Sequence, residues 1–102
     1  MIHVIATIDL APGTRDAFLI EFRKLVPLVL AEAGCVEYGP TIDADTGIPT
    51  QAKIGVDRVV IVEKWESVAA LKAHSVAPHM QAYRPTVKDY VRGMELRVLT
   101  GA

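Results

Sequence analysis

The chain has 102 residues and a mass of 11.1 kDa, which suits a single domain. Its 11 lysines and arginines against 12 aspartates and glutamates leave a net charge of -1, so it has no basic excess for binding a nucleic acid backbone. The hydrophobic share of 51% exceeds what a core of this size needs, which favours an interface with a second subunit.

Residues 2–10 are rich in β-branched side chains and end at Ala11-Pro12-Gly13, a pattern that predicts a strand followed by a turn. The run has no cationic head and is interrupted at Asp9, so it resembles neither a signal peptide nor a membrane span. The lone cysteine, Cys35, cannot form an intramolecular disulfide, which favours a reducing compartment. We therefore expect a cytoplasmic protein with no membrane partner.

Residues 15–33 predict an amphipathic helix with Thr14 as its N-cap. Pro27 lacks a backbone donor, so we expect a kink there or irregular last turns, and Gly34 is a suitable C-terminal stop. The apolar residues of this segment recur at steps of three and four, which predicts one buried face made of Phe18, Phe22, Leu25, Val26, Val29 and Ala33.

Two further strands follow, separated by a loop. Residues 35–42 predict an edge strand or a bulged strand, because Gly39 and Pro40 weaken it. Residues 43–57 are polar and punctuated by glycine and proline, which predicts a long loop. Residues 58–65 contain an uninterrupted β-branched run, so we expect a central strand that is buried on both faces.

The remaining residues predict two helices and a last strand. Ser67 is placed to cap a short helix through Ala73, and Ser75 is placed to cap a second helix that ends at Gly93. Residues 94–99 alternate apolar and charged side chains, which is typical of a strand.

The order of elements, βαββαβ, predicts an α+β fold with a ferredoxin-like antiparallel sheet and helices on one face. Such helices leave the other sheet face uncovered, although residues 58–65 are expected to be buried on both faces. The sheet of a second subunit is the simplest cover. We therefore expect a homodimer that associates through its sheet faces.

The strongest candidates for chemistry are His74 and His79, because a histidine titrates near neutrality and can accept a phenolic proton in a dry pocket. On an unbroken helix the two would lie about 140° apart, a poor geometry for a shared metal. A break near Ser75 would bring them to one cleft, whereas a surface or capping role explains them about equally well. The chain shows no nucleotide fingerprint or phosphate loop, so we expect no nucleotide or flavin cofactor.

Further candidates are aromatic or acidic. Trp65 shares a strand face with Glu63; if that face lies under the helices, Glu63 is a carboxylate in an apolar pocket that can orient a histidine. We favour the alternative, in which Glu63 lies at the strand end and reaches water or pairs with a neighbouring base. We expect Trp65 to line the pocket. Tyr38 and Tyr83 either bind a ligand oxygen or pack their rings in the core with their hydroxyls exposed to solvent.

Two groups of residues carry a resemblance to a known family. The segment from Val62 to Ser67 and the residues after it resemble the antibiotic biosynthesis monooxygenase superfamily through Val62-Glu63-Lys64-Trp65-Glu66-Ser67, Leu71, His74, Pro78-His79-Met80 and Tyr83. The resemblance extends almost end to end and includes the bacterial quinol monooxygenases through Leu25-Val26-Pro27, Glu32, Gly34-Cys35, Tyr38 with Pro40, and the 43–57 loop.

This resemblance implies a dimeric α+β barrel that oxidises a quinol or another electron-rich phenol with O2, without a metal or an organic cofactor. His74 or His79 would be the general base. Glu63 would orient that base, and the aromatic substrate would be enclosed by Trp65, Tyr38, Tyr83 and Met80.

Two alternatives stay open. In a non-catalytic dimeric module that binds a small aromatic or aldehyde-like metabolite, replacing His74 and His79 would change affinity only. An isomerase of a small phosphorylated signalling sugar, a reaction known in a related branch of the superfamily, would need a phosphate site, for which the sequence shows no convincing basic cluster.

Overall fold

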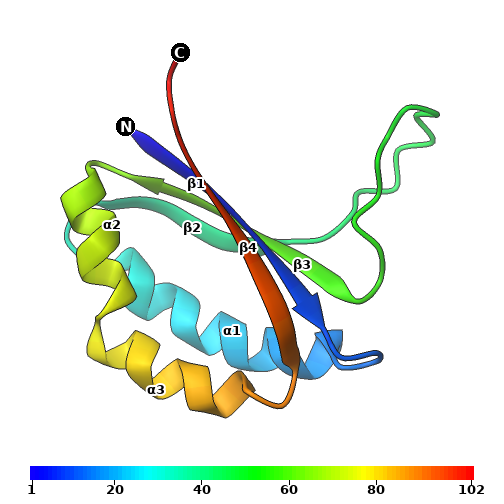
Figure 1. Cartoon of the computed structure of the whole chain (residues 1–102), viewed down its shortest axis with the longest axis horizontal. Coiled ribbons are helices and arrows are strands. Elements are labelled where there is room, and N and C mark those ends of the chain that lie inside the picture. Colours follow the sequence, from blue (N-terminus) through cyan, green and yellow to red (C-terminus); the bar gives the residue numbers. More distant parts are fainter.

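The computed structural model describes residues 1–102 and contains a four-stranded antiparallel sheet with three helices on one face (Figure 1). The strand order is β2-β3-β1-β4, so the sheet is open within one chain and the predicted ferredoxin-like α+β arrangement is confirmed. No helix has the length and apolar character needed to cross a membrane. The elements in chain order are β1 (Ile2–Leu10), α1 (Arg15–Leu30), β2 (Cys35–Thr41), β3 (Arg58–Trp65), α2 (Val68–Ser75), α3 (Pro78–Val87) and β4 (Val91–Thr100).

The core lies between α1 and the inner face of the two central strands. Antiparallel pairing places Ala6 opposite Ile61, and both side chains are buried. The prediction that β3 is buried on both faces is wrong for the single chain: Val60 and Val62 are only half-buried because their face carries no helix. The largest fully buried side chains of this core are Trp65, Phe18, Phe22, Ile61, Val4, Val29 and Val59.

Helix α1 begins at Arg15 with Thr14 at the N-cap position, as predicted, but the Thr14 side chain and the end of the helix differ from the prediction. The Thr14 hydroxyl donates to the carbonyl oxygen of Ala11 and accepts no hydrogen bond from a helix amide, so the side-chain cap is not formed. The helix continues through Pro27 but ends at Leu30, and residues 31–34 form turns before β2 begins. The predicted irregular last turns are therefore confirmed, and Ala33 lies outside the helix with an exposed side chain.

Helices α2 and α3 meet at a break between Ser75 and Pro78. The Ser67 side chain accepts a hydrogen bond from the Ala70 amide, so the predicted cap of α2 is confirmed. Ser75 does not cap α3; Pro78 occupies its first turn and holds the preceding residue, Ala77, in an extended conformation. Helix α3 ends at Val87, six residues before the predicted end, because the chain enters β4 already at Val91.

Residues 43–57 form no helix or strand, as predicted, and extend away from the sheet and helices (Figure 1). The two ends of this loop are joined by Asp43, whose carboxylate accepts hydrogen bonds from the amides of Ile54 and Gly55. These bonds hold the pKa of Asp43 below its usual value. Strand β2, which leads into the loop, lies at the edge of the sheet, as Gly39 and Pro40 predicted. Its register shift lies between Cys35 and Glu37, and the pairing is regular at Gly39 and Pro40.

Candidate active site

A cavity of about 740 Å³ lies between the inner face of the sheet and helices α2 and α3. Its wall is mainly apolar, and its size is typical of sites that enclose small organic ligands. Five of the predicted site residues line it, namely Tyr38, Glu63, His74, Met80 and Tyr83. Trp65 and His79 do not line it: Trp65 packs behind the wall, and His79 borders a small groove between α1 and α3.

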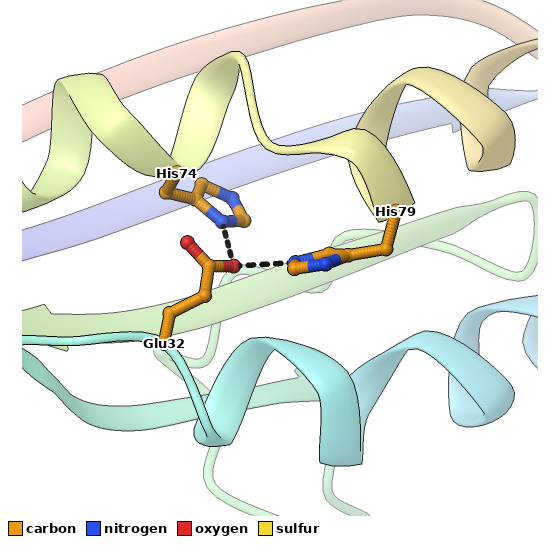
Figure 2. Close-up of side chains that lie close together, drawn as sticks. All are labelled: Glu32, His74 and His79. Atoms are coloured by element: carbon orange, nitrogen blue, oxygen red, sulfur yellow. Dashed lines mark hydrogen bonds and ion pairs between the residues drawn. The ribbon is translucent and has the colours of Figure 1, made fainter.

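The two histidines converge on one carboxylate, that of Glu32 (Figure 2). His74 Nδ1 lies 2.8 Å from Glu32 Oε2, and His79 Nε2 lies 2.7 Å from the same oxygen. Both distances are those of charge-assisted hydrogen bonds, in which the carboxylate accepts and each ring N–H donates. The carboxylate therefore fixes the orientation of both imidazole rings.

Three separate elements position this group. Glu32 lies in the turn that follows α1, His74 in the last turn of α2, and His79 in the first turn of α3. The break that Pro78 imposes turns the start of α3 relative to α2, so both rings point to one oxygen (Figure 2). The predicted helix break is therefore observed and brings both rings to one carboxylate, but not to one cleft, because His79 borders a separate groove.

His74 is the histidine that belongs to the cavity. Its residue is 6% exposed, and its ring packs with a centroid distance of 4.8 Å against Trp65 and 5.4 Å against Tyr38. Because Nδ1 donates to Glu32, the proton of a neutral ring is on Nδ1 and the lone pair is on Nε2. The site thus contains an aligned imidazole whose second nitrogen is free to accept a proton.

Glu63 is buried, with 6% of its surface exposed, so the favoured prediction that it reaches water or a neighbouring base is wrong. The indole Nε1–H of Trp65 donates to Glu63 Oε1 at 2.9 Å. Burial raises the pKa of Glu63 and Glu32 adds to this, whereas the Trp65 hydrogen bond and the charge of His74 oppose it. The sheet face under the helices therefore holds a second carboxyl group next to the imidazole.

The two cavity tyrosines are phenols, not bases. Burial raises the pKa of Tyr38 and of Tyr83, so both hydroxyls keep their protons at neutral pH. Their rings continue an aromatic wall from α1, with Phe22 stacked on Tyr38 at 5.6 Å and edge-on to Tyr83 at 5.9 Å. The wall can enclose a planar aromatic ring and donate hydrogen bonds to its oxygens.

The same trio could also supply metal ligands. The ligand atoms of Glu32, His74 and His79 lie within 4.8 Å of one another, and two imidazoles with one carboxylate are a set that first-row transition metals accept. At present each imidazole nitrogen is at hydrogen-bond distance from the carboxylate, so both rings are satisfied by that oxygen. An ion would have to replace these two hydrogen bonds.

Sequence reasoning assigned no role to Glu32, although the residue belonged to the family resemblance. It is separated from His74 by 42 residues and from His79 by 47, so no local pattern connects them. A second feature was also missed: the exposed cations Lys72, Arg84 and Lys88 line the cavity, although no basic cluster was apparent in the sequence.

Known proteins are similar to this chain in sequence and in fold. "Probable quinol monooxygenase YgiN" from Escherichia coli K12 is 45% identical over 101 residues, which cover 97% of this chain and 96% of that protein. The solved structure of PA3566 from Pseudomonas aeruginosa has a TM-score of 0.81 and 27% identity, covering 99% of this chain and 93% of that chain. Rv0793 from Mycobacterium tuberculosis has a TM-score of 0.78 and 26% identity, covering 99% and 94%. The model of the family described as "Antibiotic biosynthesis monooxygenase" matches residues 1–86, and the chain belongs to this monooxygenase family.

Proposed function

We propose that this protein is a cofactor-independent quinol monooxygenase in which His74 is the general base. The observation that carries the proposal is the hydrogen bond from His74 Nδ1 to Glu32 inside an apolar cavity. It directs the basic nitrogen Nε2 away from the carboxylate, and Glu32 stabilises the imidazolium that forms when Nε2 takes a proton. The name of the relative YgiN supports the quinol as substrate class.

The chemistry needs a base and a dry aromatic site. His74 Nε2 takes one hydroxyl proton of the quinol, and the quinolate is electron-rich enough to reduce O2. The complete reaction converts a quinol and O2 into a hydroxylated quinone and water, so the substrate supplies all the electrons. Tyr38, Met80 and Tyr83 would enclose the ring, while Trp65 supports His74 and Glu63 from behind.

The test is oxygen uptake by metal-stripped protein supplied with chemically reduced menadiol. We expect uptake well above autoxidation, and its loss in the variant carrying His74→Ala and His79→Ala, whose folding is checked by circular dichroism. Metal-stripped protein that consumes oxygen only after a divalent ion is restored would contradict cofactor independence. Bound menadiol without any uptake would favour a binding module instead.

A second candidate function is supported by a different observation. Lys72, Arg84 and Lys88 place three cations along the cavity, which suits an anionic substrate such as the phosphorylated sugar of an isomerase. An isomerase needs no O2, whereas the proposed oxidation stops without it. Turnover of a phosphorylated sugar under anaerobic conditions would therefore favour this candidate.

We also propose that a second copy of the chain covers the outer face of the sheet. Ile5 and Val62 lie opposite each other on that face, and both are half-buried although no helix covers them. A lysine there would place a charge inside such an interface. Val62→Lys is expected to halve the mass measured by light scattering, whereas Ile20→Lys, on an exposed position of α1, leaves it unchanged. Equal masses for the two variants would argue against this interface.

A further inference from the structure

The cavity contains a buried carboxyl group, that of Glu63, which the proposed base step does not use. Trp65 Nε1–H is a donor only, so Glu63 Oε1, which it meets at 2.9 Å, acts as the acceptor. The other oxygen, Oε2, has no protein partner. Because no buried side-chain oxygen in the structure is left without a partner, Oε2 lies at the surface of the cavity that Glu63 lines.

We propose that Glu63 is a second catalytic residue, the general acid that protonates the oxygen-oxygen bond as it breaks. This inference rests on the proposed quinol monooxygenase function and deepens it. The tryptophan hydrogen bond occupies Oε1, so a proton on Glu63 is directed to Oε2 and toward the substrate. Glu63 and His74 line the same cavity, which provides an acid and a base to one substrate.

The groups around Glu63 act on its charge in both directions. His74 on α2 and the Trp65 indole favour the carboxylate. Glu32, which follows α1, disfavours the carboxylate, and so does burial, the largest effect. Tyr38 on β2 is a neutral phenol, so it adds no charge of its own at neutral pH. The protonated form of Glu63 is therefore more stable relative to the carboxylate in this cavity than it is in water.

The proposed acid step follows the addition of O2 to the quinolate. The quinolate adds O2 at a ring carbon that bears hydrogen, next to the oxygen that lost its proton. The proton that His74 took from the quinol passes to the peroxide, which gives a hydroperoxide and returns His74 to its neutral form. His74 removes the proton of that carbon, and the electron pair of the carbon-hydrogen bond forms a new carbonyl. The oxygen-oxygen bond breaks, the distal hydroxide takes the proton of Glu63, and water leaves. Proton transfer from His74 to Glu63 then restores both residues. The compound formed in this step is a tautomer of the hydroxylated quinone, to which it converts.

Without an acid, the hydroperoxide has another exit. Hydroxide is a poor leaving group, so loss of the proton donor favours breakage of the carbon-oxygen bond. The products are then the unoxygenated quinone and hydrogen peroxide, formed from the same quinol and O2. The acid thus determines whether one oxygen atom of O2 is incorporated into the quinone or both leave as hydrogen peroxide, and not only how fast O2 is consumed.

The experiment measures both products in Glu63→Gln. Glutamine keeps an acceptor for the Trp65 indole and the shape of a protonated glutamate, but it has no acidic proton. We expect the ratio of hydroxylated quinone to hydrogen peroxide to fall by at least about 10²-fold, the lower end of the range for loss of a general acid. The matched control is Glu37→Gln, which removes an exposed carboxylate paired with Lys64 and should keep the wild-type ratio.

An unchanged product ratio in Glu63→Gln, with wild-type oxygen uptake intact, overturns the role of Glu63 and leaves the monooxygenase standing. Absence of oxygen uptake by the wild-type protein overturns the proposed function, and this inference with it.

A second measurement does not need turnover. The raised pKa of Glu63 means that the folded chain holds this proton above the ordinary value of 4.5, at which the unfolded chain loses it. The contribution of protonated Glu63 to the free energy of unfolding is fully present below pH 4.5 and is lost as the pH rises through the pKa of Glu63 in the folded chain. Wild type should therefore lose stability relative to Glu63→Gln over this range, and parallel pH profiles would overturn the acid role.

Discussion

His74→Asn is expected to lower the rate of quinol oxidation by about 10² to 10⁴, the range for loss of a general base. The amide nitrogen of asparagine can replace Nδ1 as the donor to Glu32, so the variant keeps this hydrogen bond and loses only the basic nitrogen. His79→Gln is the matched variant, because the glutamine amide can replace Nε2 as donor to the same oxygen. Since His79 does not line the cavity, we expect its variant to keep a rate within about tenfold of wild type.

The measurement is the initial rate of oxygen uptake with menadiol, corrected for autoxidation. His74→Ala adds a second readout, because it leaves a space that free imidazole can fill. Imidazole is expected to restore part of the rate in His74→Ala and none in His79→Ala. A larger loss in His79→Gln than in His74→Asn would assign the base to His79 and contradict the assignment made from the cavity.

Gly34→Ala is expected to lower the free energy of unfolding by about 2 to 4 kcal/mol. Gly34 has a φ of +83°, and a Cβ added there would lie 2.6 Å from the Cβ of Ala70 on α2. One part of the cost is therefore the left-handed backbone, and the other is overlap with a helix. Because α2 also carries His74, we expect the shift of this helix to lower activity as well.

Gly13→Ala separates the two parts. Gly13 has a similar φ of +77°, but a Cβ there would meet nothing within 4 Å, so only the backbone cost of about 1 kcal/mol is expected. Urea unfolding at one protein concentration measures both variants. In the double variant, Ala70→Gly should remove the overlap and give favourable coupling with Gly34→Ala. Equal decreases in the free energy of unfolding for Gly13→Ala and Gly34→Ala would show that α2 moves away from the added Cβ at no measurable cost.

Local chemistry determined most of the secondary structure. The β-branched residues of β1 predicted a strand, and the apolar spacing of α1 predicted a buried helix face, because both patterns require only neighbouring residues. Ser67 was predicted correctly as a cap, since it needs only the amide three positions on. Thr14 and Ser75 fit the same rule, but each hydroxyl instead donates to a carbonyl three positions back. Local residue type does not decide between these two hydrogen bonds.

The candidate site was determined only in part by the sequence. It indicated His74 and His79 as bases and, through a family resemblance, the aromatic residues around them. Only the tertiary structure brought Glu32 to both rings and showed that His74, not His79, lines the cavity. It also buried Glu63 against Trp65, against the favoured prediction. The physical reason is the same in each case: burial and the direction of a side chain depend on where α1, β3 and the break between α2 and α3 meet in space, and residues more than 40 positions apart carry no local signal of that meeting.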